Sequence, residues 1–191
     1  MNERAITTKL MAYFGENWDD NDFPLACLIT IRTFGTWLHG DERASVDTHG
    51  YNIFGTSKRT PSDKLIRQMR ENMNADAVVF DKQQRAVVQK AIEEVCARRD
   101  YQLRAINVRT NHAHSVVSAQ VKPEIIANAF KSYATRELRM AHLIGHDVSP
   151  WSRGRSRRYL WKSNHVAAAI DYVLYCQGIV TFEDWFESKY S

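Results

Sequence analysis

The stretch QLRAINVRTNHAHSVVSA, residues 102–119, predicts two β-strands joined by a tight turn. Residues 102–109 and 112–119 are both rich in apolar and β-branched side chains, which is typical of strands. Only Thr110 and Asn111 separate them. A connection this short favours an antiparallel hairpin, because a parallel pair would need a crossover of a dozen residues or more.

The second strand of this hairpin begins with two histidines, His112 and His114. Residues two apart on a strand point to the same face of the sheet, so both imidazoles are expected on one face and close enough to share a divalent metal. Ala113 and Ser115 turn to the other face, where small side chains let a helix pack. The histidine face is then expected to stay open for chemistry. A His-x-His pattern also arises by chance, so an incidental role remains an alternative for this pair.

Patterns on either side of the hairpin predict the remaining elements of an α+β domain. An apolar run predicts one strand before it, and alternation predicts another after it. Helices are expected after Asp81 as N-cap, from Pro123, and from Ser163 as N-cap to about Gln177. The two additional strands are placed at residues 25–32 and 159–161. This order fits a ferredoxin-like (RRM-like) sandwich, an antiparallel sheet with helices on one face plus terminal helical extensions.

The chain divides into one main unit with extensions. Residues 1–22 are interpreted as an N-terminal extension with a short helix around residues 5–14. Residues 23–178 form the expected catalytic domain, in which the polar, glycine-containing residues 40–63 are a loop insertion. Residues 179–191 are interpreted as a tail with a short helix docked on the body.

Composition is that of an ordinary globular protein with a mild basic excess. The net charge is +4 with a pI near 9.0, a weak indication of nucleic-acid binding. No apolar run approaches the length of a membrane span, and the first residues lack the layout of a signal peptide. The three cysteines form no Cys-x-x-Cys pair, so buried free thiols are expected. A cytoplasmic, nucleoid-associated protein with no membrane partner follows as the expectation.

One short segment concentrates positive charge. Residues 152–158 contain four arginines, and aromatic residues flank them. Like charges this close are costly unless an anion meets them, which favours a DNA-binding role over a merely solvated loop. Lys131 is expected to extend the same surface. The predicted DNA-binding residues are Arg153, Arg155, Arg157, Arg158 and Lys131, with Trp151 and Tyr159 as candidates for stacking on bases. Trp161 is favoured as a core residue.

Five segments of this chain match a known family in order and spacing. They are residues 27–32, VRTNHAHSVV at 108–117, FKSYA at 130–134, residues 151–161 and AAIDYV at 168–173. Over residues 24–178 the chain resembles the single-tyrosine HUH transposases, in particular the REP-associated tyrosine transposases.

This resemblance implies a ferredoxin-like enzyme that cuts and rejoins single-stranded DNA beside imperfect hairpins through a 5′-phosphotyrosine. It implies that His112 and His114 hold Mg²⁺ or Mn²⁺ together with a third polar ligand. It also implies a nucleophilic tyrosine on a late helix, for which Tyr172 is predicted. Tyr172 is expected to lie off the apolar stripe of that helix, exposed as a reactive side chain should be. Tyr175 is the rival nucleophile.

The third metal ligand departs from the family pattern. That pattern places an amide four residues after the tyrosine, where this chain has Cys176. The amide is Gln177, five residues on, and an ideal helix would not bring it to the face of Tyr172. Gln177 is nevertheless the predicted ligand, with Cys176 or water as alternatives.

Two other functions compete with a transposase enzyme. One is a domesticated, non-catalytic protein that binds hairpin DNA. The other is an RNA-binding module, which is disfavoured because residues 25–32 lack the paired exposed aromatics such a sheet would present. Whether the active site forms within one chain or across a homodimer stays open.

Overall fold

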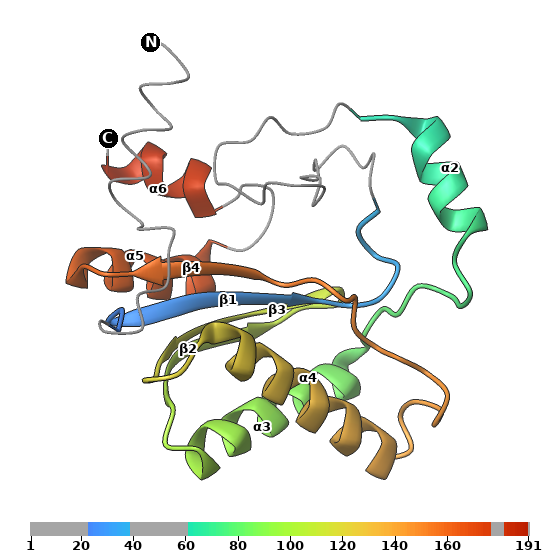
Figure 1. Ribbon diagram of the computed structural model, residues 1–191, viewed down its shortest axis with the longest axis horizontal. Coiled ribbons are helices and arrows are strands. Elements are labelled where there is room, and N and C mark those ends of the chain that lie inside the picture. The colour runs from blue at the N-terminus through green and yellow to red at the C-terminus, as the bar shows by residue number, and fades with distance from the viewer. Residues whose placement is uncertain (1–22, 39–60, 177–181, 191) are drawn as a thin grey trace.

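A computed structural model describes residues 23–38, 61–176 and 182–190. In this part of the chain, four strands form one antiparallel sheet in the order β2-β3-β1-β4 (Figure 1). The strands are β1 (Ala26–Arg32), β2 (Gln102–Val108), β3 (His112–Ser118) and β4 (Ser156–Leu160). This order and the helices between the strands confirm the predicted α+β, ferredoxin-like class.

The predicted hairpin is present as β2 and β3. These strands pair antiparallel with Val108 opposite Ala113, and the Arg109 N–H donates to the His112 carbonyl at 2.8 Å. The register shifts once, between Leu103 and Ala105. The two histidines therefore stand at the start of a strand that has neighbours on both sides, β2 and β1.

Two helices cover one face of the sheet. They are α3 (Lys82–Arg98) and α4 (Pro123–Met140), which pack against each other, with α3 also lying on β2 and α4 on β1. The predicted cap of α3 is confirmed, since Asp81 and Gln84 form a reciprocal capping box. The core of this layer consists of residues less than 2% exposed, among them Ile29, Ile31, Val88, Ile92, Val95, Ile126, Phe130 and Leu138. Their burial is the main apolar contribution to holding this layer on the sheet.

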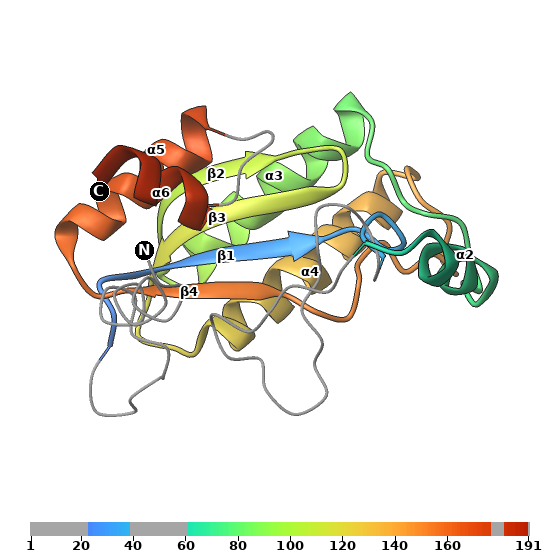
Figure 2. The ribbon, with the colours of Figure 1, turned by 90° about the horizontal axis from the view of Figure 1, so that it is seen from above.

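The opposite face carries α5 (Ser163–Tyr175), and α6 (Phe182–Tyr190) packs on α5 (Figure 2). A second apolar cluster joins them to the sheet through Leu28, Val116 and Leu160. The expectation that the histidine face stays open is therefore wrong over β2 and β3, where α5 lies. Small side chains on α5, Ala168 and Ala169, allow this close packing and are fully buried.

Two details of α5 also differ from what its residues alone would suggest. Its N-cap is Lys162, with no side-chain hydrogen bond, so the predicted cap at Ser163 is wrong. His165, although histidine is seldom fully buried, is fully buried here and lies edge-on to Phe186 with 5.6 Å between ring centroids. Both follow from α5 being held by packing on two sides, against the sheet and against α6.

A further helix, α2 (Asp63–Glu71), is absent from the sequence predictions. It is capped by Ser62, and its apolar residues Leu65, Ile66 and Met69 share one half-buried face, so the sequence carries a cap and an apolar stripe for this helix. The helix predicted near residues 5–14 and most of the predicted insertion lie outside the described residues. The domain boundaries stay predictions. Among the described helices, none combines the length and apolarity that crossing a membrane requires.

Candidate active site

The two histidines of β3 lie side by side on the face that α5 partly covers. Their ring centroids are 4.6 Å apart and their planes meet at 75°. Ala113, between them, points to the opposite face and is buried in the α3–α4 layer. The alternation of the strand thus places both imidazoles together, as the sequence predicts.

Polar residues at the same level of the neighbouring strands orient this pair. Thr30 of β1 and Asn107 of β2 both stand opposite His114 in the sheet. The Thr30 Oγ1 lies 2.6 Å from His114 Nδ1. On the other ring, His112 Nδ1 lies 2.7 Å from Asn111 Oδ1. Because both Nδ1 atoms are held by oxygens of the protein, Nε2 is the nitrogen that each ring can turn toward a metal.

The protonation state of His114 also suits metal binding. Burial lowers the pKa of His114 to about 3, and His112, Arg32 and Arg109 add to the shift in that order. At neutral pH the ring is therefore uncharged, as an imidazole must be to donate its lone pair to a metal.

Tyr172 of α5 lies directly against the histidine pair. Its ring centroid is 5.7 Å from that of His114, with the planes at 77°. Asn107 helps to fix this approach, because its side-chain amide donates to the Val173 carbonyl at 3.0 Å and so ties the end of α5 to β2. Tyr175, the rival, is 79% exposed. The structure thus brings together His112, His114 and Tyr172 from a hairpin and a distant helix.

The environment of Tyr172 differs from the expected one. Its position in the sequence predicts a side chain off the apolar stripe and exposed, whereas it is only 5% exposed. The reason is that α6 covers α5: the Tyr172 ring is 5.2 Å from that of Phe182 and 5.8 Å from that of Trp185. The face of α5 that carries Tyr172 is therefore packed between the histidines and an aromatic helix.

The donor set fits a divalent metal that also takes oxygen ligands. Two imidazoles on one strand face, each oriented through Nδ1, are suited to Mn²⁺ or Mg²⁺ completed by phosphate and water oxygens. Within the described ranges, no group of three or more His, Cys, Asp or Glu side chains could hold a metal. Gln177, the predicted third ligand, lies outside the described residues. Cys176 is partly buried and closes α5, its N–H donating to the Tyr172 carbonyl at 3.1 Å.

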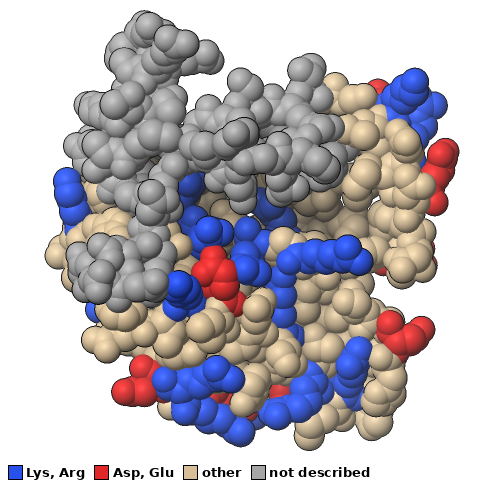
Figure 3. All heavy atoms as spheres, in the orientation of Figure 1, with Lys and Arg blue, Asp and Glu red and all other residues tan. Residues whose placement is uncertain are grey.

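The predicted DNA-binding residues fall on the edge strand β4, the segment before it and α4. Lys and Arg side chains gather over this edge in Figure 3. Arg153 is exposed, and Arg157 forms a 2.8 Å ion pair with Glu124 of α4. Lys131 donates to the Ser152 and Gly154 carbonyls, each at 2.8 Å, and so holds the arginine-rich segment in place.

The aromatic residues of this region are core residues rather than stacking platforms. Trp151 is 7% exposed, and its Nε1 donates to the Lys131 carbonyl at 3.1 Å. Tyr159 is 4% exposed and lies in the α3–α4 layer. The prediction that Trp151 and Tyr159 stack on bases is therefore wrong, because the alternation of β4 turns Tyr159 inward.

Three supporting residues, Thr30, Asn107 and Asn111, are absent from the predicted site. A signal for two of them is present: Thr30 and Asn107 are polar residues with apolar neighbours on both sides in their strands. They share a face with the histidines once the register is known. For Asn111 the sequence indicates only a role in the turn. Its contact with His112 depends on the bend of the chain at that turn.

One family model matches this chain, and two solved structures are similar to it. The family described as "Transposase IS200 like" matches residues 72–173, just over half of the 191-residue chain, and the match includes His112, His114 and Tyr172. A REP-associated tyrosine transposase bound to a REP hairpin is similar in structure at 12% identity and a TM-score of 0.44, covering 83% of this chain and 70% of that one. A protein of Deinococcus radiodurans R1 described as a candidate transposase is similar at 13% identity and a TM-score of 0.39, covering 86% of this chain and 99% of that one. No curated protein matches the sequence.

Proposed function

This chain belongs to the IS200-like transposase family, and on that premise we propose that it cleaves and rejoins single-stranded DNA with Tyr172 as nucleophile. The observation that carries the proposal is the contact between the Tyr172 and His114 rings, whose centroids lie 5.7 Å apart. A phenol beside a pair of imidazoles combines a nucleophile with a place to bind the metal and the phosphate that the phenol attacks.

The reaction is a transesterification that needs no further reactant. The phenolic oxygen of Tyr172 attacks the phosphorus, and the bond from phosphorus to the 3′ oxygen breaks. The products are a 5′-phosphotyrosine and a free 3′-hydroxyl, which takes up the proton that the phenol loses. In the reverse direction a 3′-hydroxyl attacks the phosphotyrosine and releases Tyr172, so the energy of the phosphodiester bond is retained.

His112 and His114 would hold the metal, with Gln177, Cys176 or water completing the site. A bound Mg²⁺ or Mn²⁺ would polarise the scissile phosphate and offset the charge that develops on it. Asn111 and Thr30 fix the two rings through Nδ1. Asn107 keeps the last turn of α5, and with it Tyr172, against β3.

The arginine-rich segment is proposed to bind the DNA on either side of the cleaved bond. Arg153, Arg155 and Arg158 are the proposed contacts to phosphates, which attract guanidinium groups regardless of sequence. Arg157 and Lys131 are proposed to act on DNA mainly by holding this segment, through Glu124 and through the Ser152 and Gly154 carbonyls. Imperfect DNA hairpins are the proposed target.

One observation favours a second candidate, a non-catalytic protein that binds hairpin DNA. Tyr172 is only 5% exposed because Phe182 and Trp185 cover it, and a phosphate could reach it only if α6 shifts. If α6 stays in place, the chain would bind DNA without attacking it.

A denaturing gel separates the two functions. Labelled single-stranded DNA carrying a hairpin is incubated with the protein and Mn²⁺, and covalent adducts are resolved from free DNA. We expect an adduct with the natural protein and its loss in Tyr172→Phe and His112→Ala. Tyr172→Phe keeps the ring that packs on His114 and Phe182, so loss of the adduct would reflect the missing hydroxyl.

Tyr175→Phe is the matched control, because it removes a hydroxyl from the same helix at an exposed position. It should leave the adduct unchanged. A native-gel shift without any adduct from the natural protein would support the non-catalytic binder instead.

A further inference from the structure

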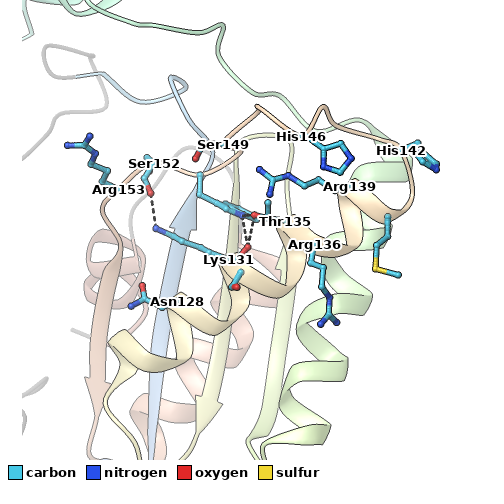
Figure 4. Close-up of a pocket in the computed structure, with 13 residues that line it drawn as sticks. Asn128, Lys131, Thr135, Arg136, Arg139, His142, His146, Ser149, Ser152 and Arg153 are labelled. Carbon is cyan, nitrogen blue, oxygen red and sulfur yellow. Dashed lines mark hydrogen bonds between the residues drawn. The ribbon is translucent and has the colours of Figure 1, made fainter.

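An open pocket of about 830 Å³ lies between α4 and the segment that leads into β4, on the sheet face opposite the histidines (Figure 4). We infer that it binds the phosphodiester backbone of DNA outside the cleaved bond, an inference that rests on the proposed function. Arg139 is its central residue.

The charge of this pocket is of one sign. Its lining includes Lys131, Arg136, Arg139 and Arg153, and it contains no aspartate or glutamate. Arg136 pairs with Glu137 at 2.8 Å, outside the lining. Among the described residues, Arg139 and Arg153 form no ion pair. Cations gathered without carboxylates repel one another, and an anion in the pocket would relieve that repulsion.

The Arg139 side chain is oriented toward such an anion. One of its terminal nitrogens donates to the Val148 carbonyl at 3.1 Å, which anchors the guanidinium across the pocket in Figure 4. Its Nε is buried and has no hydrogen-bond partner in the described structure. The phosphate contact is therefore assigned to the terminal nitrogens of the guanidinium, for which a phosphate oxygen is a strong acceptor.

The walls of the pocket are fixed before any ligand arrives. Lys131 holds the Ser152 and Gly154 carbonyls, and the Trp151 Nε1 donates to both the Lys131 carbonyl and Thr135 Oγ1, at 3.1 and 3.2 Å. Burial, followed by the neighbouring Arg155, lowers the pKa of Lys131 to about 8. A rigid site loses little entropy on binding, which favours specific contact over loose attraction.

The position of the pocket excludes the scissile phosphate as its ligand. His112, His114 and Tyr172 lie on one side of the sheet and α4 on the other. The edge formed by β4, where basic residues gather, offers a route for a strand of DNA that occupies both sites. Along α4 the lining runs from Asn128 to Met140, about 18 Å at 1.5 Å per residue. That length spans about five phosphates of one strand of B-form DNA.

The first test adds a negative charge to the pocket without removing a structural contact. Ser132 is exposed on α4 and lines the pocket, so Ser132→Glu should weaken binding of a hairpin-bearing DNA by about tenfold in moderate salt. Ala97→Glu on the exposed surface of α3 makes the same change in net charge away from the pocket and is the matched control. Equal affinities for the two variants, measured by fluorescence anisotropy, would overturn the inference.

The second test identifies the phosphate that Arg139 contacts. Binding is measured for the natural protein and Arg139→Gln with DNAs in which single phosphates outside the cleavage point are replaced by neutral methylphosphonates. At one such phosphate, the loss of binding free energy from Arg139→Gln and the loss from the methylphosphonate should be less than additive when combined, because each change removes the same contact. Full additivity at every phosphate would contradict the inference.

Two further measurements keep the inference separate from the proposed function. Adduct formation on a short DNA that spans only the cleavage point should be the same for Ser132→Glu and the natural protein. If the proteins bind DNA but none forms an adduct, the proposed function is contradicted. The comparison of Arg139→Gln with methylphosphonate DNAs would still show whether the pocket binds a phosphate. Saturable binding of inorganic phosphate or a free nucleotide, with DNA affinity unchanged in Ser132→Glu, would assign the pocket to a small anion and overturn the inference.

Discussion

At the scale of single residues, the candidate site is built across three strands at one level of the sheet. Thr30, His114 and Asn107 stand in a row on β1, β3 and β2. Thr30 orients the imidazole of His114, the proposed metal ligand, and Asn107 holds α5. This row explains why Tyr172, 58 positions after His114 in the chain, lies against its ring.

Thr30→Val should weaken metal-dependent cleavage. Valine has the shape of threonine without the hydroxyl that contacts His114 Nδ1 at 2.6 Å, so the ring loses its orienting partner. Removal of such a partner typically costs about 10–100-fold in metal affinity or activity. The measurement is the Mn²⁺ concentration that gives half-maximal adduct formation. Thr30→Ser keeps a hydroxyl, so its Mn²⁺ concentration for half-maximal adduct formation should be close to that of the natural protein. An unchanged Mn²⁺ dependence in Thr30→Val would contradict the role of Thr30.

Acid stability should report the burial of His114. Its pKa falls from 6.5 to about 3 on folding, so between these values the unfolded chain binds a proton that the folded protein does not. Stability is therefore complete above about pH 6.5 and is lost as the pH falls toward 3, with a slope of at most ~1.4 kcal/mol per pH unit from this group. Urea unfolding in the presence of a chelator measures it.

In that experiment His114→Gln should show a shallower loss of stability with acid than the natural protein. The exposed His142 provides the control, His142→Gln. Equal slopes for the natural protein and His114→Gln would contradict the burial effect.

The residues of the site differ in how far sequence alone could predict them. The histidine pair follows from strand alternation, which needs only local spacing. The burial of Tyr172 could not be predicted, because it depends on α6 folding back over α5. Thr30 and Asn107 required the register, which is set by pairing between segments far apart in the chain.

At the scale of elements, hairpin β2–β3 and helices α3 and α4 match their predicted positions closely, since each carries its signal within itself. The hairpin has a two-residue connection, α3 has the Asp81 cap, and α4 begins at Pro123. In contrast, α5 has no side-chain cap, so the misplaced cap at Ser163 could not be corrected from local sequence. The omission of α2 could have been, because Ser62 caps it and Leu65, Ile66 and Met69 mark its apolar face. Packing, rather than propensity, fixes α5.

The edge strand β4 leads to a prediction about its arginines. Arg157 is paired with Glu124 at 2.8 Å and contacts the Tyr159 hydroxyl at 3.2 Å, whereas Arg153 is exposed. Arg153→Gln should therefore reduce the slope of log affinity against log salt by about one, as expected for one lost phosphate contact. Arg157→Gln should change that slope less. A larger change of slope in Arg157→Gln than in Arg153→Gln would contradict the proposed division.

At the scale of the whole molecule, the sheet separates two kinds of surface. One face carries the histidines, with α5, which contains Tyr172, and α6 packed over it. The other face carries α3, α4 and the basic pocket. The edge strand β4 joins them with its arginines (Figure 3). If one DNA strand binds on both sides of the sheet, the basic pocket contacts phosphates that are distant from the proposed scissile phosphate.

The most direct test is to locate the nucleotide on the protein after the reaction. Cleavage after lysine and arginine leaves residues 163–189 as one peptide, which contains both Tyr172 and Tyr175. Fragmentation mass spectrometry of that peptide, after reaction with hairpin-bearing single-stranded DNA and nuclease digestion, identifies the modified side chain. We predict a nucleotide linked through its 5′-phosphate to Tyr172 in the natural protein. A nucleotide on Tyr175 or elsewhere, or an unmodified peptide from a reaction that has cleaved the DNA, would contradict the assignment of Tyr172 as the nucleophile.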